Sequence, residues 1–108
     1  MNLSELIENV KKIERDSIRD DQVNRLELVV QVARLPEINS MLTSFFGPPK
    51  KPAGEQPSGD TKKVTERYGG ILKDQTLYSK AESGNSYLAM IWPWQDKARA
   101  TVKIFSVG

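Results

Sequence analysis

Two segments of alternating character around a short turn place the strongest constraint on how this chain folds. Residues 75–82, "QTLYSKAE", and residues 86–92, "SYLAMIW", flank the tripeptide "SGN". Gly and Asn between two such segments are a signal for a two-residue β-hairpin turn. We expect this turn at Gly84 and Asn85, and a third strand over residues 98–107 that completes a three-stranded antiparallel meander.

The position of the turn predicts which side chains share a face of the sheet, because side chains alternate along a strand. Pro93 should end or bend the central strand, with Trp92 in the core and Trp94 at its rim. One face is apolar enough to need a helical cover. The residues expected on that face are Leu77, Ala81, Leu88, Met90, Trp92, Ala100, Val102 and Ile104.

Residues 1–46 are predicted to form a helical region with three helices. The first helix begins at a capping box of Asn2 and Glu5. The second follows an aspartate cap near residue 20 and carries an apolar stripe over residues 23–33. The third starts at Pro36 and ends at Gly47.

The helices carry more apolar surface than a three-stranded sheet can cover. A homodimer through the first two helices would bury the surplus. The candidate helical interface therefore consists of the apolar stripe of the first helix, which is formed by Leu3, Leu6, Ile7, Val10 and Ile13.

Residues 47–62, "GPPKKPAGEQPSGDTK", are expected to be a flexible linker or loop, since they combine four prolines and three glycines without periodicity. The "PKKP" motif fits a polyproline ligand, but a plain spacer is the favoured interpretation. Residues 64–68 could be a helix or a strand. The predicted fold class is α+β, with N-terminal helices packed on a β-meander region (63–108) as one domain.

The chain contains no histidine and no cysteine, which excludes most general-base, thiol and zinc chemistry. An acidic cluster is the best metal candidate, but interleaved arginines favour helix caps and a solvated turn. Its members are Glu14, Asp16, Asp20 and Asp21. We predict a non-enzymatic protein without catalytic residues, metal or cofactor.

The second face of the predicted sheet is the candidate partner surface, because aromatic and basic side chains alternate on it. These residues are Tyr78, Lys80, Tyr87, Ile91, Lys103 and Phe105. The leading hypothesis is a small protein-interaction or assembly module. The alternative is single-stranded nucleic-acid binding, in which bases stack on the aromatic rings.

Charge and hydropathy say little about the partner. Residues 1–46 carry six basic and eight acidic side chains, and residues 47–108 carry ten basic and six acidic ones. This mild basic excess supports nucleic-acid binding only weakly.

No apolar run approaches the ~20 residues of a membrane span, and the N-terminus is unlike a secretory signal. We therefore expect a soluble, cytoplasmic protein without a membrane partner.

Overall fold

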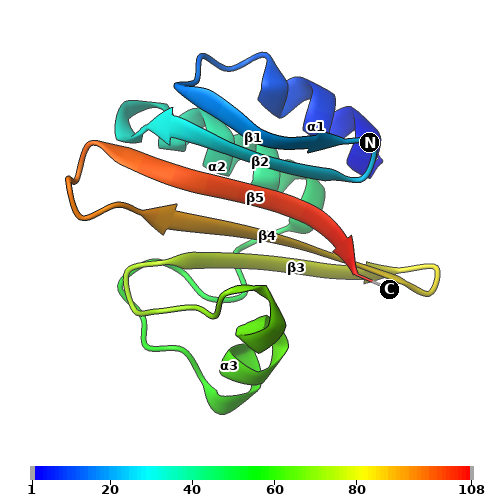
Figure 1. Ribbon diagram of the computed structural model, residues 1–108. Helices are drawn as coiled ribbons and strands as arrows, with labels where there is room; N and C mark the ends of the chain where they lie inside the picture. Colours follow the sequence, from blue (N-terminus) through cyan, green and yellow to red (C-terminus); the bar gives the residue numbers. More distant parts are fainter. Residues whose placement is uncertain (1, 108) are drawn as a thin grey trace.

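The computed structural model describes residues 2–107, which form three α-helices and a five-stranded antiparallel sheet. The α+β class is confirmed, but the three-stranded meander and the purely N-terminal placement of the helices are wrong. The strand order is β1-β2-β5-β4-β3. Figure 1 shows α1 and α2 behind the sheet, and α3 beside β3, which is the edge strand opposite β1.

The elements follow one another along the chain in the order helix, hairpin, two helices, and three strands. The helices are α1 (Leu3–Lys11), α2 (Leu35–Phe46) and α3 (Gly59–Thr65), with short 3-10 helices η1 (Val32–Arg34) and η2 (Glu66–Tyr68). The strands are β1 (Ser17–Gln22), β2 (Arg25–Gln31), β3 (Thr76–Glu82), β4 (Asn85–Pro93) and β5 (Arg99–Val107).

The first and third predicted helices are confirmed, and so are their end signals. The Asn2 side chain accepts a hydrogen bond from the Glu5 backbone at 2.9 Å, and the Glu5 carboxylate accepts one from the Asn2 backbone. This capping box satisfies amides that the first turn of α1 leaves unpaired. Gly47 ends α2 with φ of 84°, a backbone conformation that glycine adopts without strain.

The second predicted helix is wrong, because residues 17–31 form the β1–β2 hairpin. Residues 23 and 24 make the turn, and Val23 is 82% exposed. The apolar residues of β2 fit a helical spacing of three and four, but they also alternate as a strand requires, and short apolar runs do not distinguish the two. Leu26, Leu28 and Val30 face the core from alternate positions, and each is fully buried.

The β3–β4 turn lies one residue earlier than predicted. Glu82 pairs with Asn85, so that Ser83 and Gly84 form the turn, with φ of 52° and 80°. Positive φ at both positions is the conformation of a type I′ hairpin. Leu77 therefore pairs with Met90 and not with Trp92. The shift changes the register by two residues and leaves the alternation within β3 and β4 unchanged.

The register of β5 overturns the predicted faces of the sheet. Val102 pairs with Ile91 and Ile104 with Ala89, which puts these four side chains on one face. This inner face is the one that α1 and α2 cover, and it also holds Leu26, Leu28, Val30 and Tyr78. The other, outer face holds Leu77, Leu88, Met90, Trp92 and Phe105. Trp92 thus does not lie under the helices that were expected to cover it.

Part of the outer face is covered by α3, η2 and Ile71. The Tyr68 ring lies 4.7 Å from the Phe105 ring, measured between centroids. Gly69 has φ of 106°, and a Cβ at this position would lie 3.3 Å from the Trp92 ring. The Ser58 side chain caps α3 by accepting a hydrogen bond from the Thr61 backbone. This second, smaller apolar layer explains why residues 64–68 are helical.

Lys51 attaches the Pro/Gly-rich segment to the sheet. Its backbone pairs with Leu77 in both directions, at 3.2 and 3.0 Å. Its side chain is 2% exposed, and the ammonium donates to the carbonyls of Pro52, Lys73 and Gln75. Burial lowers the pKa of Lys51, while three carbonyl acceptors favour the protonated ammonium, the form that has three N–H donors.

Replacing Lys51 should destabilise the fold, because Lys51→Met removes an ammonium that donates to three carbonyls in a partly buried site. We expect a loss of about 2–3 kcal/mol in the free energy of unfolding, measured by chemical denaturation. Lys50→Met is the matched control, since Lys50 is exposed and should change stability little. Equal stability of the two variants would contradict this role of Lys51.

Candidate binding surfaces

The structure divides the predicted partner surface between the two faces of the sheet. Tyr78 and Ile91 lie on the inner face, and each is 2% exposed. The Tyr78 hydroxyl donates to Asn39 of α2 at 2.7 Å. Lys103 and Phe105 lie on the outer face. The six residues therefore do not form one continuous surface.

Lys80 and Tyr87 stay together at the edge of the inner face, next to the end of α2. The Tyr87 ring lies 5.7 Å from the Phe45 ring. The Lys80 ammonium donates to the Phe45 carbonyl at 3.1 Å and pairs with Glu82 at 3.0 Å. Both side chains are half-buried. These contacts hold the β3–β4 hairpin against α2.

The predicted helical interface faces inward. All five residues of the stripe on and after α1 are buried against the sheet and α2, with at most 8% exposure. A second chain could contact Leu3, Leu6, Ile7, Val10 and Ile13 only if they left this core. The extra strands β1 and β2 supply the inner face that the prediction lacked.

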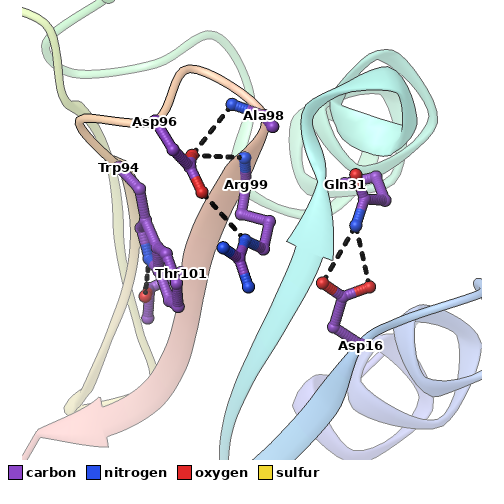
Figure 2. A network of polar contacts seen from close by, with 7 residues as sticks. All are labelled: Asp16, Gln31, Trp94, Asp96, Ala98, Arg99 and Thr101. Atoms are coloured by element: carbon purple, nitrogen blue, oxygen red, sulfur yellow. Dashed lines mark hydrogen bonds and ion pairs between the residues drawn. The ribbon is translucent and has the colours of Figure 1, made fainter.

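The four acidic residues that were considered as a metal site each contact a different basic or amide side chain. Asp16 accepts both hydrogen bonds from Gln31 at 2.9 Å (Figure 2), and Glu14 pairs with Arg34 at 2.6 Å. Asp20 pairs with Arg25, and Asp21 with Lys11. Within residues 2–107, no group of three or more potential ligand side chains is placed to hold a metal ion.

A groove of about 510 Å³ runs between the α3–η2 unit and the β3–β4 hairpin. We call it the α3–hairpin groove. Its apolar part is open, because Val64 on α3 is 50% exposed and Tyr68 and Val107 are half-buried. The lining residues are Lys63, Val64, Arg67, Tyr68, Ser79, Lys80, Ala81, Ser86, Tyr87, Leu88 and Val107.

The charged side chains that line this groove are all basic. They are Lys63 and Arg67 from the α3–η2 unit and Lys80 from β3. Lys80 is neutralised by Glu82, whereas Lys63 and Arg67 form no ion pair with any residue in the described part of the chain. The groove thus combines an open apolar surface with unbalanced positive charge.

The edge of β3 borders the groove and is only partly paired. Leu77 bonds outward to Lys51, so its main-chain groups point away from β4. Because this direction alternates along an antiparallel strand, Ser79 and Ala81 also point outward. Lys51 with Leu77 is the single pairing at this edge among residues 2–107. Two donors and two acceptors of the backbone are therefore available beside the groove.

A second surface lies on the uncovered part of the outer face, around Trp94. Its indole N–H donates to Thr101 at 2.9 Å (Figure 2). The guanidinium groups of Arg99 and Arg19 lie 4.8 and 5.5 Å from the ring centroid. Such distances are typical of cation–π contacts. We call Trp94, Arg19, Arg99 and Thr101 the Trp94 cluster.

Asp96 shapes the turn that carries the Trp94 cluster. Its carboxylate accepts hydrogen bonds from the Ala98 and Arg99 backbone amides and from the Arg99 guanidinium, at 2.9–3.1 Å (Figure 2). These contacts, led by the Ala98 amide, lower the pKa of Asp96. The ionised carboxylate therefore fixes both the turn and the position of Arg99.

The sequence contains no clear sign of either surface. Arg19 of β1 and Trp94, which follows β4, come together only in the tertiary structure, because β2 and β5 lie between their strands. Val64 and Arg67 become functional candidates only because α3 and η2 pack beside a hairpin about 15 residues further on.

No helix within residues 2–107 has the length and apolarity needed to cross a bilayer. The chain matches no protein-family model, and comparisons with curated proteins and with solved structures find no similar protein either.

Acidification should test the role of Asp96. Its folded pKa lies below the ordinary value of 3.8, so its contribution to stability is complete above that value and is lost as pH falls through the folded pKa. Between about pH 4 and pH 2, wild type should lose more stability than Asp96→Asn, which does not titrate. Denaturation midpoints across this range measure the difference.

The control for this experiment is Glu66→Gln, which removes an exposed carboxylate on η2 that forms no ion pair within residues 2–107. The assigned role of Asp96 is wrong if Asp96→Asn and Glu66→Gln show the same acid slope.

Proposed function

We propose that this chain is a small non-enzymatic protein-interaction module that binds a segment of a partner polypeptide in the α3–hairpin groove. The observation that carries the proposal is an open apolar surface next to unpaired strand backbone. Val64 is 50% exposed there, and Ser79 and Ala81, whose main-chain groups point away from β4, line the same groove. A polypeptide can satisfy both features at once.

The size of the groove agrees with this proposal. A volume of about 510 Å³ accommodates a few side chains of a bound segment, and sites for small ligands are usually more enclosed. The groove is bounded by a hairpin that α2 holds through Lys80 and Tyr87, so its walls are preorganised. Preorganised walls reduce the entropy lost on binding.

The distribution of charged side chains favours the α3–hairpin groove over the Trp94 cluster as the main partner-binding surface. Around the Trp94 cluster, basic and acidic side chains alternate, since Asp96 pairs with Arg99 and Asp20 pairs with Arg25. The α3–hairpin groove has no acidic lining residue among those described. A surface with one sign of charge selects its partner more strongly than a balanced one.

Substitution of Val64 tests the proposed function. A photo-crosslinking amino acid at position 64 identifies the partner, and the affinity of the purified partner is then measured by calorimetry. Val64→Asp should raise the Kd about tenfold or more, because it places a charge on the apolar part of the groove.

Val23→Asp is the matched control, since Val23 is an equally apolar and more exposed valine on the β1–β2 turn. It should leave the Kd unchanged. A partner whose affinity falls equally in both variants, or in neither, does not bind in the groove.

A second candidate function is single-stranded nucleic-acid binding on the outer face. The observation that favours it is Trp94 with two guanidinium groups near its ring, and Lys103 lies 5.8 Å from the nearby Trp92 ring. Arg19 and Lys103 form no ion pair within residues 2–107. Aromatic rings beside the unpaired cations of Arg19 and Lys103 suit the stacking of bases and the neutralisation of phosphates.

Fluorescence anisotropy with a labelled oligothymidylate tests this second function. Binding should weaken steeply with salt, and Arg19→Glu with Lys103→Glu should raise the Kd about tenfold or more. Lys12→Glu with Arg15→Glu changes the net charge equally at exposed positions near α1 and is the control. Equal effects of the two double variants would indicate unspecific attraction only.

The cytoplasmic location expected from the sequence remains part of the proposal. Fractionation of cells that express the chain tests it.

A further inference from the structure

We propose that the occupant of the α3–hairpin groove is an extended acidic segment of another protein, which adds a sixth strand at the edge of β3. This inference rests on the proposed function and specifies the partner of the same groove. It follows from three observations, namely a pairing already present at this edge, the chemistry of the segment before it, and the charge of the groove.

The chain itself shows that the β3 edge accepts a strand. Lys51 pairs with Leu77 through both of its main-chain groups, at 3.0 and 3.2 Å, as an antiparallel neighbour would. The next outward positions along β3 are Ser79 and Ala81. A segment that continued this pairing toward the hairpin would pass beside Ser79 and Ala81, which both line the groove.

The residues before Lys51 leave these positions unpaired for a chemical reason. In the antiparallel register set by Lys51 and Leu77, Pro49 would face Ser79. Proline has no backbone N–H, so it cannot donate to the ladder, and the preceding residue is also a proline. The internal pairing therefore ends after one residue. An external segment with ordinary amides can supply the missing donors.

The charge of the groove specifies an acidic segment. Lys63 and Arg67 line it without a carboxylate partner in the described chain. In an added strand, every second side chain would point to the side of the sheet where α3 lies. An acid at these alternate positions would meet Lys63 and Arg67, and this pattern gives specificity as well as attraction.

A second copy of this chain is a less suitable occupant. Its acidic edge strand β1 is the candidate segment within residues 2–107 that offers both a free edge and carboxylates, but Asp20 is paired with Arg25 at 2.6 Å and Asp21 with Lys11 at 3.0 Å. These carboxylates would have to leave their partners to reach Lys63 and Arg67. We therefore assign the groove to a different protein.

The test begins with a library of random 12-residue peptides, from which binders are selected on the full chain. The selected peptides should be enriched in acidic residues. Affinities are measured by fluorescence anisotropy of synthetic, labelled peptides. Lys63→Glu with Arg67→Glu should raise the Kd about tenfold or more, whereas Lys12→Glu with Arg15→Glu, which changes the net charge equally, should raise it less than about twofold.

A change in the peptide backbone tests the added strand without altering the protein. The best peptide is synthesised in two versions, one N-methylated at the odd-numbered residues and the other at the even-numbered residues. The version whose methyl groups block the amides that face β3 should not bind, and the other version should still bind, since its methylated amides point to solvent. If both versions bind, or if neither binds, the proposal of a sixth strand is wrong.

The outcomes separate this inference from the proposed function. If Val64→Asp weakens binding of the selected peptides but these peptides are neutral or basic, the groove binds polypeptides and the proposal of an acidic strand is wrong. If Val64→Asp weakens binding of none of the selected peptides, both proposals fail. If sedimentation shows a dimer that Lys63→Glu with Arg67→Glu dissociates, the occupant is a second copy of the chain, and the assignment to another protein is wrong.

Discussion

The pairing of β5 with both of its neighbours is the constraint on which the rest of the structure depends. β5 lies between β2 and β4, and it joins the N-terminal hairpin to the C-terminal one. Its register aligns Val102 with Leu28 on one side and with Ile91 on the other. These side chains make the floor of the inner face, on which α1 and α2 pack. A shift of one residue would turn every core side chain of β5 to the other face.

The parts of the fold that local chemistry determines could be predicted from the sequence. The capping box of Asn2 and Glu5 defined the start of α1, and Pro36 and Gly47 bounded α2. The β2 segment could not be identified, because Leu26 and Val30 are spaced as in a helix and Leu28 between them fits a strand as well. Pairing with β5, whose paired residues lie about 70–80 positions further along the chain, is the distant contact that makes this segment a central strand.

The candidate site was predictable only in fragments, for the same reason. Lys80 and Tyr87 were assigned to a partner surface and do line the groove. Tyr78 and Ile91 were assigned to it as well, but α2 covers them. Lys63, Val64 and Arg67 were not recognised, since their proximity to the hairpin is a tertiary contact without a local signal. Faces of a sheet cannot be assigned from a turn alone when an additional hairpin joins the sheet.

The central position of the last strand has a consequence for biosynthesis. The β1–β2 hairpin is synthesised well before its neighbour β5, so Leu26, Leu28 and Val30 stay without this sheet partner until β5 has been translated. Sheets that depend on such distant pairings form slowly. During the interval between the synthesis of β2 and that of β5, the nascent chain therefore exposes an unpaired strand edge and apolar side chains, which are features that chaperones protect from aggregation.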